Sequence, residues 1–149
     1  MSGRWTAELY EDRSGHYPIE AWLDSLTDQQ SAALRAAVTH VLEPEGLALA
    51  STAWLKPLRE GLYEFRVRHS AHDIMSMYAA AGDVPPATPE KILLRVFVHF
   101  HGQRVILLLH GYDKGADDSP RRQQREIAQA RKRLGAWKRA NVAGKSRGR

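Results

Sequence analysis

The chain has 149 residues, of which 43% are hydrophobic and 26% are charged, and this composition indicates one soluble globular domain. It has no cysteine, no apolar run of the roughly 18 residues that a membrane span needs and no apolar secretion signal near its start, which excludes disulfides and thiolate metal sites and predicts a cytoplasmic protein. The net charge of +5 is unevenly distributed, because residues 121–149 carry a net +10 and residues 1–120 a net −5.

A strand and two helices are predicted at the N-terminal end. Residues 4–10 alternate apolar and polar side chains, as an edge strand does. Residues 16–26 place a proline near a helix start and keep one apolar stripe. In residues 27–43, Thr27 and Gln30 have the spacing of a capping box. We therefore expect a helical hairpin after the first strand.

Three strand signals follow a loop predicted for residues 46–61. They are LYEFRVRHS (62–70), ILLRVFVHF (92–100) and RVILLLH (104–110). The short turn HGQ joins the last two, which should therefore be antiparallel neighbours. The stretch between the first two, residues 71–91, holds three prolines and is unusually long for a connection, so we predict a mobile or functional loop.

A basic helix is predicted after the sheet. Ser119 and Pro120 are typical of a helix start, and an apolar stripe continues to about Trp137. The excess of arginine and lysine is the electrostatic footprint expected for a polyanion such as nucleic acid, and a solvated helix face is the alternative. We assign residues 1–140 to a single domain and expect a disordered basic tail over residues 141–149.

Alternation along the strands predicts a charged face on the sheet. Glu64, Arg66 and Arg68 of the first strand point away from the core. Arg95 of the second strand shares that face, so pairing of the two strands would bring Arg66 and Arg95 together.

The third strand is expected to be buried on both faces, with Leu107 and Leu109 on one side. The same alternation places Ile106, Leu108 and His110 on the other side. The predicted fold is α+β: a mainly antiparallel, twisted sheet with helices packed on one side and a cationic concave surface on the other.

Such a surface suits metal-independent cleavage of RNA. When the 2′-OH attacks the adjacent phosphate, an enzyme must accept a proton, stabilise negative charge and protonate the leaving oxygen. We predict Arg66, Arg95, Lys114 and Glu64 as catalytic residues, because guanidinium and ammonium groups stabilise phosphate charge and a carboxylate or a histidine can act as the base. The residues predicted to bind substrate around them are Lys56, Arg59, Arg68, His99, His110, Tyr112, Arg121 and Arg122. No cofactor is expected, and no metal, because the spacing of histidines and acids matches no metal motif.

Each assignment has a structural alternative. Glu64 and Arg66 can form an ordinary ion pair on a solvated strand face. His99 and His110 can be hydrogen-bonded structural histidines, and the arginines at the start of the last helix, Arg121 among them, can simply solvate it.

The order of three motifs resembles a known family. LKPLREGLYEFRVR is followed by LRVFVHFHGQRVILLLHGYDKG and then by the basic segment RRQQREIAQARKRL. This order is similar to that of the RelE/HigB superfamily of toxins, in particular the phage-derived HigB-like branch of type II toxin–antitoxin systems. The resemblance covers roughly residues 54–137, and the N-terminal strand and helices suit the same RelE-like fold.

The resemblance implies a ribosome-associated mRNA endonuclease that blocks translation. It implies as partners mRNA, the ribosome and a cognate antitoxin, usually a HigA-like helix-turn-helix protein. By position in the strand pattern, Arg66 and Arg95 match residues that handle the scissile phosphate, and Lys114 matches the basic residue after the last strand. Glu64 lies where RelE has a lysine, although glutamate is usual in the HigB-like branch.

One departure from the family concerns proton transfer. The tyrosine that RelE carries near its C-terminus has no clear counterpart here, and Tyr112 or a histidine is the candidate replacement. Two other functions stay open at this point: a ParE-like, non-catalytic gyrase poison that shares the scaffold, and a nucleic-acid-binding module without catalysis.

Overall fold

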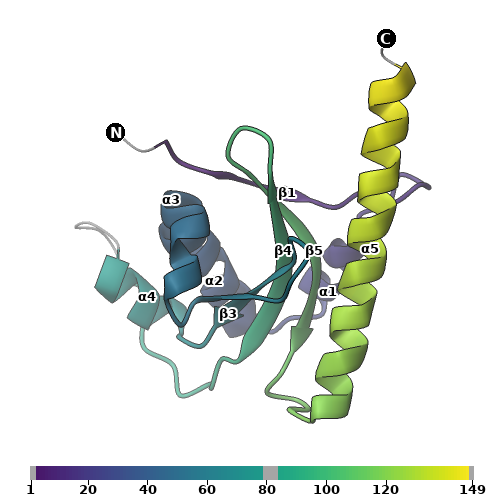
Figure 1. The fold of residues 1–149 in the computed structure, drawn as a ribbon. Coiled ribbons are helices and arrows are strands. Elements are labelled where there is room, and N and C mark those ends of the chain that lie inside the picture. The colour runs from purple at the N-terminus through teal and green to yellow at the C-terminus, as the bar shows by residue number, and fades with distance from the viewer. Residues whose placement is uncertain (1–2, 79–83, 148–149) are drawn as a thin grey trace.

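A five-stranded mixed sheet forms the centre of the fold (Figure 1). The computed structural model describes residues 3–78 and 84–147. The strands are β1 (Thr6–Leu9), β2 (Leu55–Pro57), β3 (Tyr63–Val67), β4 (Leu94–His101) and β5 (Val105–Asp113), in the spatial order β1-β5-β4-β3-β2. β1 runs parallel to β5, and the other neighbouring strands are antiparallel. The predicted α+β class and the edge position of the first strand are confirmed.

Helices cover both faces of this sheet. They are α1 (Pro18–Asp24), α2 (Asp28–Ala37), α3 (Glu43–Glu45), α4 (Ala71–Tyr78) and α5 (Pro120–Arg147), with a π-helical turn (Val38–Leu42) between α2 and α3 and a 3-10 helix (Gly46–Ser51) after α3. α1, α2 and α4 pack on one face, and α5 runs along the other (Figure 1).

The N-terminal helices begin where the sequence predicts. Pro18 is the first residue of α1, where its missing N–H breaks no helical hydrogen bond. At the start of α2, the Thr27 hydroxyl accepts a hydrogen bond of 3.1 Å from the Gln30 N–H, and the Gln30 side chain accepts one of 3.0 Å from the Thr27 N–H. The predicted capping box is confirmed, and it satisfies two N–H groups that would otherwise lack partners.

The prediction of an open concave surface is wrong, because α5 packs against that face. Its apolar stripe of Ile127, Ala130 and Leu134 meets Phe97 and Leu109 of the sheet in a second hydrophobic cluster. Removing these apolar side chains from water favours the covered arrangement over an open face. The charged residues that share the face therefore lie beneath or beside the helix.

A β-bulge changes the faces of β5. Phe97 pairs with His110 and Val98 with Leu108, so Leu109 is an extra residue with no partner on β4. The prediction that His110 shares the face of Leu108 is therefore wrong. Beyond the bulge, His110 lies on the α5 side, where its ring stacks on Phe97 at 6.1 Å.

Two predicted loops contain regular structure. Residues 46–61 include the 3-10 helix and β2, a three-residue strand in which Pro57 is tolerated because the strand lies at the sheet edge. Residues 71–91 begin with α4, whose start is capped where the Ser70 hydroxyl accepts the Asp73 N–H at 3.2 Å. Residues 84–91 have no regular structure, and residues 79–83 lie outside the described residues.

The prediction of a disordered tail is wrong for residues 141–147, because α5 continues to Arg147. No proline interrupts residues 141–147, although Asn141, Gly144 and Ser146 are weaker helix formers than the alanines, lysines and arginines of the preceding turns. Residues 148 and 149 lie outside the described residues. Over the part of the chain that the structure describes, no helix is both long and apolar enough to cross a membrane.

The packing of α1 on β5 leads to a stability prediction. A Cβ atom at Gly111 would lie 2.3 Å from the Trp22 ring. We expect Gly111→Ala to lower the free energy of unfolding by about 1–3 kcal/mol, because the indole must shift to relieve the clash. Urea unfolding followed by circular dichroism measures this. Gly135→Ala is the matched control, since its Cβ would meet only the flexible end of Arg139 at 3.4 Å and alanine favours the helix. An equal loss in both variants would contradict the prediction.

Candidate functional site

Strand pairing brings Arg66, Arg95 and Tyr112 into one row on the sheet face beside α5. Arg66 of β3 pairs with Arg95 of β4, and Arg95 pairs with Tyr112 of β5. The predicted convergence of Arg66 and Arg95 is confirmed. Because like charges directly opposite each other on antiparallel strands repel, this row requires a counter-charge.

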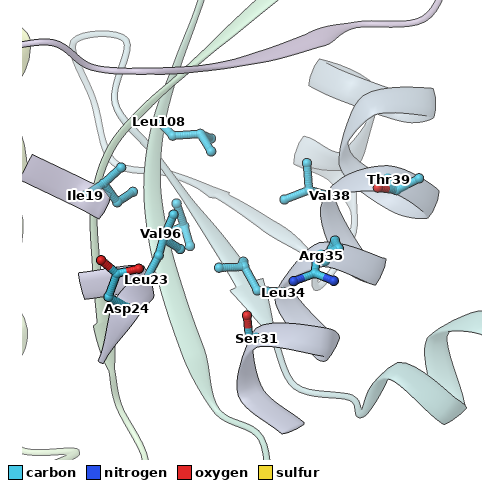
Figure 2. A pocket seen from close by; sticks show the side chains of 10 residues that line it. All are labelled: Ile19, Leu23, Asp24, Ser31, Leu34, Arg35, Val38, Thr39, Val96 and Leu108. Atoms are coloured by element: carbon cyan, nitrogen blue, oxygen red, sulfur yellow. The ribbon is translucent and has the colours of Figure 1, made fainter. Parts of the chain in front are cut away.

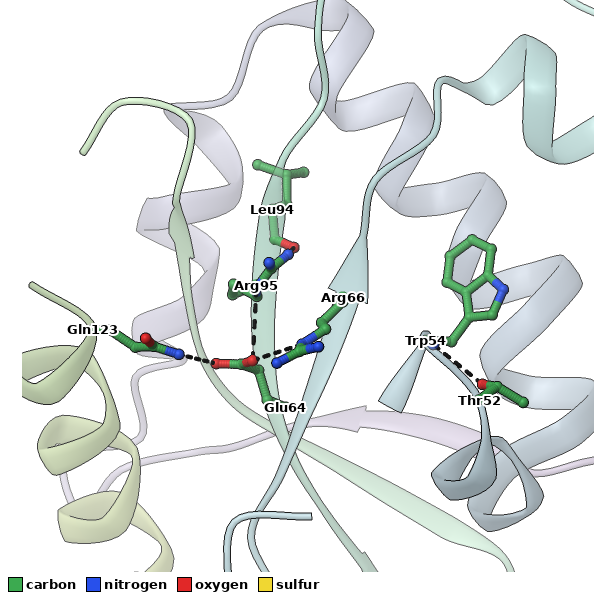
Figure 3. A network of polar contacts seen from close by, with 7 residues as sticks. All are labelled: Thr52, Trp54, Glu64, Arg66, Leu94, Arg95 and Gln123. Carbon is green, nitrogen blue, oxygen red and sulfur yellow. Dashed lines mark hydrogen bonds and ion pairs between the residues drawn. The ribbon is translucent and has the colours of Figure 1, made fainter. Parts of the chain in front are cut away.

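Glu64 supplies the counter-charge (Figure 3). Its Oε1 accepts a hydrogen bond of 2.9 Å from Arg66 Nε and lies 3.6 Å from Arg95 Nε, and its Oε2 accepts a hydrogen bond of 3.2 Å from Gln123 Nε2. One carboxylate therefore joins β3, β4 and α5. The alternative of a solvated surface pair is wrong, because Glu64 is 0% exposed. We call Glu64, Arg66, Arg95 and Gln123 the Glu64 network.

The Glu64 network is costly to bury. Taking a charged side chain out of water costs on the order of several kcal/mol in a protein. Replacing a buried ion pair by apolar residues of similar volume often leaves the stability unchanged or raises it. The donors around Glu64 offset this cost without removing it. Arrays of buried, mutually oriented charges occur preferentially at functional sites. The side chain of Arg66 is 24% exposed, so it is the charged member of the network that reaches solvent.

Arg95 lies behind Arg66 and is only 4% exposed. Burial lowers the pKa of its guanidinium, and the nearby charge of Glu64 opposes that effect. The expectation that Arg95 lies on a cationic concave surface is wrong, since α5 covers this face of the sheet. Its contact with Glu64 instead suits a positioning role.

Tyr112 completes the row and is 2% exposed. Its ring stacks on Phe97 at 6.0 Å, and the guanidinium carbon of Arg122 lies 5.2 Å from the ring centre. Burial, followed by the charge of Glu64, raises the pKa of the Tyr112 hydroxyl, so the group keeps its proton at neutral pH. Among the described residues, neither this hydroxyl nor Arg95 Nε has a hydrogen-bond partner. Two adjacent polar groups therefore remain able to bind a water or a ligand oxygen.

His110 is held by two residues of α5. Its Nε2 lies 3.1 Å from Glu126 Oε2, and its Nδ1 lies 2.9 Å from Arg133 Nη1. Burial lowers the pKa of the imidazole, the charge of Arg133 lowers it further, and Glu126 raises it. With both ring nitrogens occupied, the structural alternative for this histidine is favoured.

Two further predicted residues lie toward the other end of the sheet face. His99 Nδ1 is 2.7 Å from the carbonyl oxygen of Gly61, and its ring meets Trp137 at 5.4 Å. Arg59 lies in the turn between β2 and β3, at the opposite end of β3 from Arg66, with its carbonyl accepting a hydrogen bond from Arg131. Neither residue joins the Glu64 network.

The remaining predicted residues lie on segments that adjoin the strands and the helix of the network. Lys56 is exposed and pairs with Glu64 across the β2–β3 edge. Lys114 follows β5 directly and is half-buried, with its N–H donating to the Leu93 carbonyl at 2.9 Å. Arg68 and Arg121 are exposed, on the stretch after β3 and on the first turn of α5. Of these cations, the exposed Arg68 lines a small hollow together with Arg66.

Gln123 is the site residue that the sequence reading missed. It lies four residues before Ile127, and so extends the apolar stripe of α5 by one turn toward the N-terminus. A polar residue on a stripe that faces a sheet needs a polar partner there. The polar residue on an otherwise apolar stripe is the feature of the sequence that indicates a polar partner on the sheet, and Glu64 is that partner.

A separate hollow of about 400 Å³ lies on the opposite face of the sheet, between α1 and α2 (Figure 2). Its lining residues are Ile19, Leu23, Asp24, Ser31, Leu34, Arg35, Val38, Thr39, Val96 and Leu108. Val96 and Arg95 are successive residues of β4, so their side chains point to opposite faces. The hollow therefore does not adjoin the Glu64 network.

Comparison of the chain with protein-family models and with curated proteins returned no match. Within residues 3–78 and 84–147, no three histidine, aspartate or glutamate side chains gather as metal ligands would. What the site can do follows from its geometry. Arg66 presents a guanidinium that Glu64 orients from behind, near the exposed Arg68, and this arrangement suits a phosphate.

Glu64→Gln tests the role of the carboxylate. The amide keeps the size of the side chain but leaves Arg95 without a counter-charge, so we expect the free energy of unfolding to fall by about 3 kcal/mol, the lower end for a broken buried ion pair because Arg66 still reaches solvent. Chemical denaturation measures the change. Glu60→Gln is the control, since that side chain is 85% exposed and should leave the unfolding midpoint unchanged. A Glu64→Gln protein as stable as wild type would show that the network carries no net charge interaction.

The lowered pKa of His110 predicts a pH dependence. Because the folded-state pKa lies below the ordinary value of 6.5, the unfolded chain binds more protons between these two values, and the free energy of unfolding should rise with pH across that window. Burial lowers the pKa of His101 too, so its contribution has the same sign. Urea unfolding at several pH values near and below 6.5 measures the slope. We expect a shallower slope in His110→Gln, and still shallower when His101→Gln is added; an unchanged slope would contradict this.

Proposed function

We propose that this protein is the toxin of a type II toxin–antitoxin system and acts in the cytoplasm as a metal-independent, ribosome-associated mRNA endonuclease that inhibits translation. The observation that carries the proposal is the arrangement of Arg66, Glu64 and Arg95: an accessible guanidinium oriented by a buried carboxylate, with a second guanidinium behind it. A cation fixed in advance stabilises charge that develops on a phosphate without reorganising during the reaction. The order of motifs that resembles the RelE/HigB superfamily, with its RelE-like fold, supports the same function.

The geometry divides the proposed roles. Arg66 contacts the scissile phosphate, since its side chain reaches solvent. Glu64 and Arg95 are positioning residues, because they are buried behind it. Tyr112 is the proposed acid in place of the tyrosine of RelE, and its raised pKa keeps it protonated. Its burial implies that the first turn of α5, which carries Arg122 over the ring, shifts when RNA binds.

The proposed partners follow from the same resemblance. Messenger RNA and the ribosome are the partners in the reaction, and a HigA-like helix-turn-helix antitoxin is the proposed inhibitor. A basic surface around Arg66 would suit an acidic segment of such an antitoxin as well as RNA.

A second candidate, nucleic-acid binding without catalysis, is favoured by one feature of α5. Its 28 residues carry ten lysines and arginines and the single acid Glu126. Binding through this helix would depend on its charges and hardly at all on Arg66.

Induced expression of the wild type, Arg66→Ala and Arg35→Ala in a bacterial host separates these functions, with growth recorded and new mRNA 5′ ends mapped. Arg35 is the matched control, because it is exposed on α2 at the opposite side of the sheet. We expect the wild type and Arg35→Ala to arrest growth and produce new ends within translated frames, and Arg66→Ala to lose at least tenfold of the cleavage, since removing one charge-stabilising donor typically costs a factor of about 10²–10³.

Other outcomes would contradict the nuclease. Growth arrest without new mRNA ends would favour the ParE-like gyrase poison. Wild-type cleavage that Arg66→Ala retains in full would remove Arg66 from the site, and no arrest with RNA binding intact would favour the binding module.

A further inference from the structure

Three aromatic side chains gather at the β2–β3 edge of the sheet, next to Arg66. They are Trp54, His69 and Tyr78, and we call them the Trp54 platform. The Trp54 ring lies 5.5 Å from the His69 ring and 6.0 Å from the Tyr78 ring. The residues come from three places in the fold: the approach to β2, the stretch after β3 and the last turn of α4.

The Trp54 indole is fixed in place. One of its faces stacks on the buried ring of Phe65, with 5.9 Å between centroids and 22° between planes. Its Nε1–H donates a hydrogen bond of 3.1 Å to the Tyr78 hydroxyl. Its backbone N–H donates one of 3.1 Å to Thr52 Oγ1 (Figure 3). A ring held in this way would lose little conformational entropy on stacking with a ligand.

The platform is nevertheless accessible. Tyr78 is 46% exposed, His69 is exposed and Trp54 is partly exposed. Aromatic side chains that only complete a core bury most of their surface. Three neighbouring rings that remain open to solvent are more typical of a binding surface.

Cations lie directly beside the platform. The backbone N–H of Arg66 donates a hydrogen bond of 2.7 Å to the carbonyl of Trp54. A hollow of about 30 Å³ is lined by Ala53, Trp54, Arg66, Arg68 and His69. This volume is about the share of one water molecule in the liquid, so the hollow cannot enclose an organic ligand. A ligand would have to lie on the rings, with its charge at the guanidiniums.

We propose that the Trp54 platform stacks an unpaired base of single-stranded RNA, with the adjoining phosphate on Arg68, while Arg66 holds the next phosphate along the strand. The inference rests on the proposed function and names the side of the site at which the RNA passes the sheet edge. Aromatic rings beside a cationic groove are the usual means of binding single strands, because every base has a face that can stack. The rings favour this occupant over an acidic peptide, because an acidic peptide would pair with the two arginines without using the rings.

Binding of a short, 2′-O-methylated single-stranded RNA tests the proposal, since this probe lacks the nucleophile and is not cleaved. We expect His69→Ala and Trp54→Phe each to raise the dissociation constant about fivefold or more. Arg68→Gln should make the slope of log affinity against log salt shallower by about 0.7. Tryptophan fluorescence should be quenched by the probe in the wild type and much less in Trp54→Phe.

Tyr17→Leu is the control, because Tyr17 is 40% exposed at the start of α1 and lies outside the platform. Circular dichroism and the melting temperature establish that each variant folds; His69 and Arg68 are exposed, so those two variants keep the test decisive if Trp54→Phe unfolds. Duplex RNA of the same sequence should not quench the fluorescence, because paired bases cannot stack on a protein ring.

The platform proposal would be overturned if His69→Ala and Arg68→Gln bound the probe with wild-type affinity. It would also be overturned if the protein bound the duplex as tightly as the single strand, or did not bind the probe at all. The mapping of mRNA ends separates this result from the fate of the nuclease. If the wild type cleaves mRNA and the platform variants bind the probe normally, the platform proposal is refuted and the proposed nuclease stands. If these variants lose binding of the probe and the wild type does not cleave mRNA, the platform proposal is supported and the proposed nuclease is refuted.

Discussion

The arrangement of the sheet face that α5 covers depends on the buried carboxylate of Glu64 and the ion pairs that it makes. Without it, Arg66 and Arg95 would stand opposite each other with nothing to neutralise them. The same carboxylate accepts a hydrogen bond from Gln123, so it also fixes where the first turns of α5 lie. Farther along the helix, apolar contacts such as those of Leu134 are joined by the hydrogen bond from Arg131 to the Arg59 carbonyl. Polar and apolar contacts along the length of the helix therefore determine the position of α5.

The features that the sequence predicted correctly depend on local rules. The capping box needs only Thr27 and Gln30, three residues apart. The alternation of side chains along β3 and β4 placed Phe65 in the core and Arg66 and Arg95 on the opposite face, because that alternation is a property of any extended strand. Among the candidate site residues, the ones on these two strands are accordingly the ones whose neighbours were predicted.

The features that the sequence did not predict depend on contacts between distant segments. The bulge that turns His110 toward α5 follows from how β5 fits β4, and strand alternation alone gave the opposite face. The cover over Arg95 and Tyr112 needs the basic helix to return to the sheet, and its many charges suggested solvent instead. Gln123 became visible as a site residue only with Glu64 beside it. In the site, charged groups at the sheet edge are therefore exposed to solvent, whereas the groups that orient them are buried.

The parallel pairing of β1 with β5 has a consequence for the order of folding. Thr6 pairs with Val105, so the first strand of the chain has no partner until most of the polypeptide has left the ribosome. Contacts between residues this far apart in sequence form slowly, because a long loop must close before they are made. The β3–β4–β5 meander can assemble earlier, with the outer edge of β5 unpaired in the meantime. During synthesis that edge is the surface of the nascent protein most open to wrong pairing, and docking of residues 6–9 closes it.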